Sequence, residues 1–547
     1  YMVGGYIKSS EGIRDAGFNS EQGNQFTVNI TKVFEKGELN LYTRQTDDRG
    51  TWYLPTPLNV EGIDANYTQI GPLNRQGTIT YGPNDTAESF DFGEGRGWDG
   101  HVSGGSIKLD LGNDWQLVDR FNLTKGKANT FGLVPNGSAT TVASVADNGE
   151  SATGAVTGTV YDGDTPIQQI GRWVVLKDIE AFTNDLAVSK SWEDFDTSFG
   201  IYSATTKAED WWSIGNTAYH VLQPGGELLD GIECNTDAQG CDWNYDISSV
   251  GDANTFAVYA TGTWYATTDL SIDLGLRREN HEVSYSVDEG LDGEITKALE
   301  YDETKTSWTV GANYALNDTS GVFVRMNRGY KMPYFDDFRD NWGAYTGGND
   351  LIKEVTQGEL GYKFMNDSIQ FFATAFANEV KGDTFVRRPG APAEILTNEA
   401  YGLELDGRYS HDSGFSLSVN ATIQETEITA SANNEGNESQ RQPGWQVRVT
   451  PSYGFDIGDM YATVYGTLSA VDDRFGNNEN TVVLEGYEKI DVGLTLEPTE
   501  SLRLQFSVDN LTDEQGITEG DPRNPDSPNG RYIMPRSMKL SVSYLFF

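Results

Sequence analysis

The chain has 547 residues, and its 82 Asp and Glu outnumber its 39 Lys and Arg, which gives a formal net charge of −43. This balance excludes nucleic acid as a partner, because phosphate binding needs a basic surface. No run of about 18 apolar residues occurs, so a membrane-spanning helix is excluded, whereas a membrane barrel of alternating strands is not. The acidity has two explanations, a saline habitat or a mouth that attracts cations.

Alternation of apolar and polar residues predicts strands along the whole chain. The pattern is clear at 26–31, 415–422, 502–509 and 539–546. These segments run about ten residues, the length that a tilted strand needs to cross a bilayer. The 61 Gly, 27 Tyr, 25 Phe and 12 Trp also favour an all-β fold.

The links between the expected strands are alternately short and long. Short polar turns are expected at 35–37, 112–114, 193–196, 266–269, 317–319, 366–368, 411–414, 456–459 and 498–501. Long links rich in Gly, Asn and Asp are expected at roughly 9–23, 45–99, 126–180, 207–253, 283–302, 330–353, 381–398, 429–445, 471–486 and 510–535.

This alternation is typical of an outer-membrane β-barrel, which has tight turns at the periplasmic rim and long loops outside. We therefore predict one all-β domain over residues 1–547, a transmembrane antiparallel β-barrel with about 20 strands and all long links on one side. The alternative, a soluble antiparallel sheet with one wet face, does not explain why the links are sorted by length.

Several segments resemble the barrel of TonB-dependent outer-membrane receptors, in the same order. Those towards the C-terminus are NRGYKMPYFDDF (327–338), EVTQGELGYKF (354–364), FFATAFANEVKGD (371–383), SVDNLTDEQG (507–516) and GRYIMPRSMKLSVSYLFF (530–547). GGYIKSSEGIRDAGF (4–18) and TDDRGTWYLPTPL (46–58) are similar to early strands and loops of that family, so the resemblance covers nearly the whole chain.

The resemblance implies a 22-stranded barrel in the outer membrane of a Gram-negative bacterium, filled by an N-terminal plug that follows a segment contacting TonB. We expect that the plug, the TonB-contacting segment and the first strands are missing from this chain; a relative without a plug is the alternative. The expected partners are outer-membrane lipid and lipopolysaccharide, the TonB system through the missing segment, and a transported solute. The implied activity is active nutrient uptake and not an enzymatic reaction.

Two cysteines, Cys234 and Cys241 in CNTDAQGC, are spaced to close a small loop by a disulfide, which indicates an oxidising compartment. No cofactor or resident metal is expected. The match to GxGxxG at Gly95, Gly97 and Gly100 lacks a strand-to-helix context, and the four histidines are scattered. Calcium held by acid-rich loops is an open alternative.

Aromatic residues in the long links are the candidate substrate contacts, because exposed rings stack on sugar faces and on flat chelates. They are Trp52, Tyr53, Trp98, Trp211, Trp212, Trp243, Tyr334, Trp342 and Tyr345. Asp and Glu dominate the same links, and such a field disfavours an anionic chelate. We therefore favour an oligosaccharide or a similar neutral polar solute. A ferric siderophore or other metal chelate is the alternative, and a passive porin or a surface-binding barrel is a further one.

Overall fold

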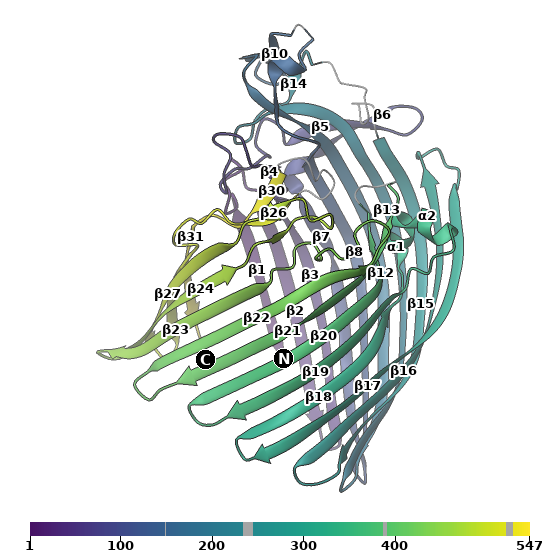
Figure 1. Ribbon diagram of the computed structural model, residues 1–547, viewed down its shortest axis with the longest axis vertical. Coiled ribbons are helices and arrows are strands. Elements are labelled where there is room, and N and C mark those ends of the chain that lie inside the picture. Colours follow the sequence, from purple (N-terminus) through teal and green to yellow (C-terminus); the bar gives the residue numbers. More distant parts are fainter. Residues whose placement is uncertain (148, 233–243, 387–390, 521–528, 547) are drawn as a thin grey trace.

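The computed structural model describes residues 1–147, 149–232, 244–386, 391–520 and 529–546, and most of them lie in one curved antiparallel sheet (Figure 1). This sheet holds 21 strands, of which β9 (Thr140–Thr141) has only two residues. The other strands are β1 (Met2–Ser10), β2 (Glu21–Phe34), β3 (Gly37–Gly50), β7 (Arg96–Gly112), β8 (Trp115–Pro135), β12 (Pro166–Ser191), β13 (Phe195–Val221), β15 (Asn244–Tyr265), β16 (Leu270–Glu289), β17 (Lys297–Asn317), β18 (Ser320–Lys331), β19 (Lys353–Met365), β20 (Ile369–Phe385), β21 (Glu394–Ser410), β22 (Phe415–Ala430), β23 (Trp445–Ile457), β24 (Met460–Val471), β27 (Tyr487–Thr499), β28 (Leu502–Asp509) and β31 (Ser537–Tyr544).

The smaller elements lie in the long links. They are β4 (Thr56–Pro57), β5 (Gln76–Tyr81), β6 (Thr86–Asp91), η1 (Phe92–Glu94), η2 (Val142–Ser144), β10 (Ser151–Gly154), β11 (Val160–Asp162), β14 (Leu229–Asp230), α1 (Phe335–Asp340), α2 (Trp342–Thr346), β25 (Arg474–Phe475), β26 (Val483–Leu484), β29 (Ile517–Gly520) and β30 (Asn529–Tyr532). Among the described residues, no helix is long and apolar enough to cross a membrane.

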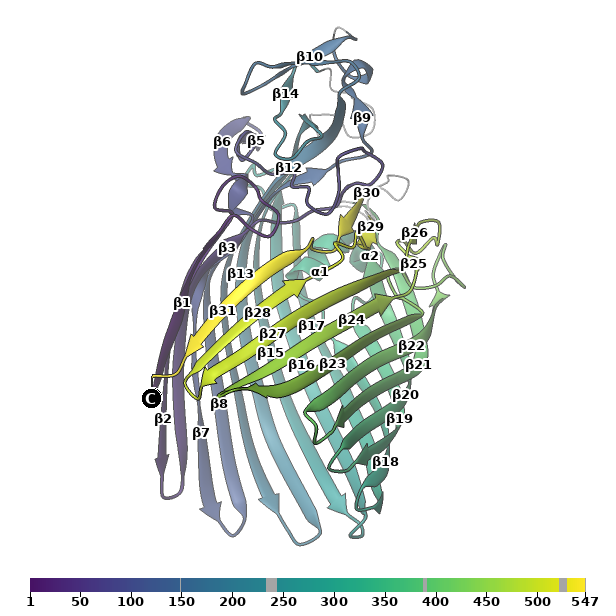
Figure 2. The same cartoon turned by 90° about the vertical axis from the view of Figure 1, so that its left-hand side faces the viewer.

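The order of the sheet confirms the predicted topology. Each long strand pairs antiparallel with the next one along the chain, as in the β2–β3 and β19–β20 ladders. Tight turns lie along the lower rim of the sheet and the long links lie at the upper rim (Figures 1 and 2). Within the described ranges β1 pairs only with β2, and β31 pairs only with β28, so the sheet curves strongly without a ladder that closes it.

The two faces of the sheet differ in chemistry. On β2 the even-numbered Phe26 and Ile30 are about half exposed, while the odd-numbered Gln25, Thr27 and Asn29 lie on the other face. Partners in register share a face, so the row of Ile30 continues through Leu41 and Gly105 to Phe121. We call this apolar face outward and the polar face inward.

Aromatic rings on the inward face cover glycines of the neighbouring strand. Gly200 pairs with Tyr259, and a Cβ atom added to Gly200 would lie 2.0 Å from the Tyr259 ring. The Tyr259 hydroxyl donates to Asp185 at 2.7 Å, so the ring is fixed at both ends. Glycine is needed here for close approach of a ring and not for an unusual backbone angle.

Gly200→Leu is therefore expected to displace Tyr259 and to lower the free energy of unfolding by about 1–3 kcal/mol, the usual cost of overpacking. Denaturant unfolding of the refolded chain in detergent measures this change. Gly358→Leu is the matched control, because a Cβ atom at Gly358 meets nothing within 4 Å. Equal destabilisation by both substitutions would contradict the packing argument.

A small sheet of β10, β11 and β14 lies at the top of the upper rim (Figure 1), and Glu227 is buried in it. The Glu227 carboxylate accepts hydrogen bonds from the backbone N–H groups of Val156 and Thr157, at 3.0 and 2.9 Å, and from the hydroxyls of Thr157 and Tyr161. Burial raises the pKa of Glu227, but these donors outweigh it and hold the pKa below the ordinary value.

Because the folded-state pKa is lowered, Glu227 stabilises this small sheet above the unfolded-state pKa of about 4.3. That stabilisation is lost as the pH falls through the lower pKa of the folded state. Glu227→Gln is expected to weaken the sheet by about 2 kcal/mol at neutral pH, since hydrogen bonds to a charged group are lost. The hydrogen-exchange protection factors of residues 151–162 should then fall, and they should no longer change between pH 3 and 5 once the intrinsic pH dependence of exchange is divided out. Asp230→Asn, at an exposed position of the same sheet, serves as the control.

Candidate functional site

The link between β18 and β19 folds against the inward face of the sheet and forms the centre of the candidate site. Its helix α1 begins after Tyr334, whose backbone N–H donates to the Asp337 carboxylate at 3.0 Å, and Asp336 and Asp337 occupy the first turn, where the helix dipole favours acids. At the start of the link, His281 Nε2 lies 3.0 Å from the Pro333 carbonyl oxygen.

Two phenylalanines on α1 pack into an apolar cluster on β15, β16 and β17. Phe338 is completely buried, and its ring centroid lies 5.2 Å from that of Tyr301. Phe335 stacks on Tyr285 at 5.9 Å and lies over Gly251, where a Cβ atom would come within 2.5 Å of its ring. The inward face of the sheet therefore has a space, left by Gly251, that the Phe335 ring of this helix fills.

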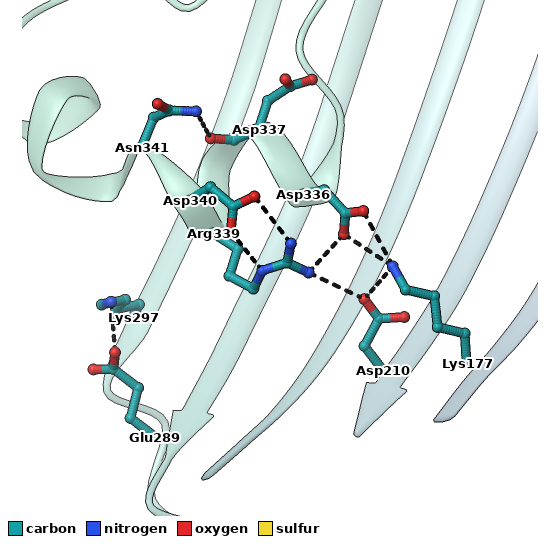
Figure 3. Close-up of polar contacts among 9 residues, drawn as sticks. All are labelled: Lys177, Asp210, Glu289, Lys297, Asp336, Asp337, Arg339, Asp340 and Asn341. Carbon is teal, nitrogen blue, oxygen red and sulfur yellow. Dashed lines mark hydrogen bonds and ion pairs between the residues drawn. The ribbon is translucent and has the colours of Figure 1, made fainter. Parts of the chain in front are cut away.

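Ion pairs join α1 to β12 and β13 (Figure 3). The Arg339 guanidinium lies 2.7 Å from Asp336, 2.8 Å from Asp340 and 3.8 Å from Asp210 of β13. Lys177 of β12 lies 3.0 Å from both Asp210 and Asp336. Arg339 and Asp210 are buried, with side-chain exposures of 4% and 3%. We call these five residues the ion cluster.

Burial and charge act in opposite directions within the ion cluster. Burial raises the pKa of Asp336, but the Arg339 guanidinium and the Lys177 ammonium together hold that pKa below its ordinary value. Arg339 also lies 3.9 Å from the centre of the Trp212 ring, a cation–π contact. The basic groups are thus already engaged by carboxylates and a ring.

Four of the sequence-predicted site residues gather around α1. Trp212 lies beneath Arg339, and Tyr334 is 39% exposed with its ring 5.0 Å from His281. Trp342 and Tyr345 lie 6.3 Å apart, and the Tyr345 ring contacts Phe338 at 5.2 Å. Rings and carboxylates therefore meet in one region of the inward face.

The remaining predicted rings lie elsewhere. Trp52 packs on Trp173 at 6.2 Å, and Tyr53 lies beneath Arg14 at 4.9 Å. Trp98 lies on the inward face of β7, where its ring covers Gly100 and Gly126. Trp243, Cys234 and Cys241 lie outside the described residues, so the expected disulfide stays a prediction.

Trp211 has the opposite orientation to its neighbour Trp212. It pairs in register with Leu176 on the outward face and packs against Tyr81 of the β5–β6 hairpin at 4.9 Å. A groove of about 580 Å³ follows the same row of residues, through Arg49, Leu176 and Trp211. Trp211 therefore lies on the outward face of the sheet. It stands above the band of exposed apolar side chains on that face, which we call the apolar belt.

Sequence reasoning did not identify the pairing of Arg339 with Asp210, nor the role of Lys177 and His281. Lys177 and Asp210 lie in segments expected to be loops, whereas they extend β12 and β13 beyond the bilayer and pair directly in register. The alternation of polar and apolar residues within these segments could have placed Lys177 and Asp210 on the same face of the sheet. Nothing in the sequence pairs either residue with Arg339.

Comparison with known proteins identifies the family. The pattern described as TonB dependent receptor-like, beta-barrel matches residues 14–511. The chain belongs to this family. TonB-dependent receptors lie in the outer membrane of Gram-negative bacteria, interact with TonB and bind substrates, and this barrel belongs to the same membrane.

Among curated proteins, the pesticin receptor of Yersinia enterocolitica is 25% identical over 321 residues, which is 55% of this chain and 45% of the relative. The pesticin receptor of Yersinia pestis matches to the same extent. The chain thus spans about half the length of the curated relatives that it matches.

Among solved structures, the ferric yersiniabactin uptake receptor FyuA from Yersinia pestis has a TM-score of 0.70 and 16% identity, covering 100% of this chain and 76% of that one. BauA, the ferric preacinetobactin receptor from Acinetobacter baumannii, has a TM-score of 0.64 and 15% identity, covering 99% and 74%. These likenesses confirm the fold of a TonB-dependent barrel. In the part of the receptor that the structure describes, no three His, Cys, Asp or Glu side chains are grouped to hold a metal ion.

Proposed function

We propose that this chain is the barrel of a receptor that imports a metal chelate of the ferric-siderophore class across the outer membrane. The observation that carries the proposal is that receptors with the same fold over the whole chain are named for ferric yersiniabactin and ferric preacinetobactin. The pesticin receptor relatives share the sequence at a higher identity. These names favour the chelate over the oligosaccharide that the loop composition suggested.

The charges of the ion cluster restrict the kind of chelate that we expect. Lys177 and Arg339 face three carboxylates, so the cluster carries a net negative charge. A strongly anionic chelate would be repelled by this surface and would have to break existing ion pairs. A neutral or weakly charged chelate that stacks on Tyr334 and Trp342 fits better.

The receptor's other partners belong to the same proposal. Cross-strand pairs such as Lys125–Glu180 and Lys207–Asp252 lie on the outward face above the apolar belt, at 2.7 and 3.1 Å, where lipopolysaccharide head groups would meet them. From the family we also propose that TonB supplies the energy for transport by the whole protein. The role of this chain as its barrel domain is part of the same proposal.

Uptake by intact cells tests the function. Cells with and without the gene are compared under iron limitation, with a panel of radioiron-loaded neutral and anionic chelates and a panel of labelled oligosaccharides. Loss of the gene is expected to reduce uptake of at least one ferric chelate tenfold or more, without an effect on the oligosaccharides. Loss of oligosaccharide uptake alone would overturn the proposal and restore the sugar hypothesis.

A further inference from the structure

A second cavity of about 420 Å³ lies on the inward face, at the upper ends of β20, β21 and β22. Asn378, Ala400 and Thr426 form one cross-strand row in this cavity. Tyr401 and Ile423 belong to neighbouring rows that point to the opposite face, and both are exposed and apolar. The cavity therefore lies on the inward face. Parts of the links 431–444 and 472–486 complete its lining.

Most of the described residues that line this cavity have uncharged polar side chains, although Val380, Phe385, Leu396 and Ala400 line it as well. The polar ones are Asn378, Thr384, Asn398, Gln424, Thr426, Ser439, Gln440, Gln442 and Asn478. Asp383 is the one inward carboxylate among the described lining residues, and it is neutralised by Lys353 at 2.6 Å. Glu399 also borders the cavity, but it lies in the outward row with Glu379 and Glu427. We call this cavity the amide pocket.

Hydrogen bonds from the links 431–444 and 472–486 hold the amide pocket in shape. Ser439 donates its hydroxyl to Asn398 Oδ1 at 3.1 Å, and Gln424 donates to the Pro443 carbonyl at 3.2 Å. The Gln440 backbone N–H donates to Asn478 Oδ1 at 3.3 Å, which joins the link 431–444 to the link 472–486. Three strands and two hydrogen-bonded links therefore form the walls of the pocket.

Three amide atoms that border the pocket have no hydrogen-bond partner among the described residues. They are the acceptors Asn378 Oδ1 and Gln440 Oε1 and the donor Asn478 Nδ2. A buried polar atom without a partner costs about 1–3 kcal/mol. Such a cost is relieved by a ligand that offers donors and acceptors together, after small rotations of these side chains.

We propose that the amide pocket binds an uncharged group that both donates and accepts hydrogen bonds, such as a secondary amide or an acetamido sugar. Among the described residues of this lining an anion would find no free cation, and a cation would find the Asp383 carboxylate already engaged by Lys353. An apolar group would leave the amides unsatisfied. This assignment goes beyond the proposed function, because it holds whether the group belongs to a metal chelate or to a glycan.

Two variants separate binding from folding. Asn378→Leu keeps the branched shape of the side chain and removes an unpartnered acceptor, and the larger leucine has the cavity to expand into, so a purely structural role predicts no loss of stability. Ala400→Phe fills the cavity and retains every amide. Asn122→Leu, on the inward face of β8, removes an amide outside the pocket and is the control for binding. Because it also breaks the hydrogen bonds of Asn122 with Tyr42 and Thr124, only its affinity and not its stability is compared.

The experiment titrates the refolded full chain in detergent micelles and follows binding by calorimetry or saturation-transfer NMR. The probes are a neutral ferric trihydroxamate with a peptide backbone, N,N′-diacetylchitobiose and an anionic ferric tricatecholate. At least one of the two neutral probes is expected to bind, with a Kd about tenfold weaker in Asn378→Leu and Ala400→Phe and unchanged in Asn122→Leu.

The outcomes are distinct. Binding of the chitobiose without the trihydroxamate keeps the amide pocket and contradicts the chelate function, and binding of the trihydroxamate supports both. The proposal is overturned if neither neutral probe binds the parent chain, if both pocket variants keep the parent affinity, or if the tricatecholate displaces the neutral probe.

Discussion

Replacing Arg339 by methionine is expected to release the link 332–352 from the barrel wall. The substitution removes one of the two cations of the ion cluster and leaves Asp210 buried beside Asp336 and Asp340, with Lys177 as the only counter-charge in the cluster. Breaking a buried pair by removing one partner costs about 3–5 kcal/mol, mostly because a charge stays buried without compensation.

Hydrogen exchange of residues 332–352 measures this release directly. A local cost of about 3 kcal/mol raises exchange roughly a hundredfold, while the ladders of β12 and β13 should keep their protection. Arg339→Lys should give a smaller effect, since it keeps the charge and loses the planar fork. Lys381→Met removes an exposed pair with Glu379 and is the control. Unchanged exchange in Arg339→Met would show that the ion cluster does not hold the link.

Replacing Phe338 by alanine is expected to release the same link through its apolar contact. Phe338 is fully buried between Tyr301 and Tyr345, so its truncation costs about 3–5 kcal/mol in lost burial and cavity formation. Gly251→Leu should have a similar effect from the side of the wall, because the new side chain would occupy the space of the Phe335 ring.

The readout for Phe338→Ala is hydrogen exchange together with uptake of the transported solute. We expect exchange of the link to rise as in Arg339→Met, and uptake to fall because Tyr334 and Trp342 are no longer held in place. Thr346→Ala, at an exposed position of α2, is the matched control. Normal uptake with a released link would mean that the rings around α1 are not substrate contacts.

The barrel could be predicted from the sequence because its two signals are local. Alternation within each strand and the sorting of links by length predicted the order of the strands, about 20 of them, and the rim on which the long links lie. The extent of the strands could not be predicted as well. β12 and β13 run far into the segments expected to be loops, because Lys177, Asp210 and their neighbours pair in register above the bilayer.

The site was harder to predict because it depends on contacts between distant segments. Tyr334, Trp342 and Tyr345 were identified from their density in one link, but Asp210, the buried partner that ties Arg339 to the wall, lies on β13, 129 residues earlier along the chain. Trp211 and Trp212 were taken together, although neighbouring residues of a strand point to opposite faces. The amide pocket left a signal in NNEGNESQRQ (433–442) and GNNEN (476–480), whose amides meet only when both links fold over β21 and β22.

The central claim, that this receptor takes up a metal chelate, is tested most directly by calorimetric titration of the refolded chain with matched ferric chelates and glycans. We expect saturable binding of a neutral or weakly charged ferric chelate, no response to the glycans, and an affinity at least tenfold weaker in Trp342→Ala. Saturable binding of a glycan, with no response to any ferric chelate, would contradict the account.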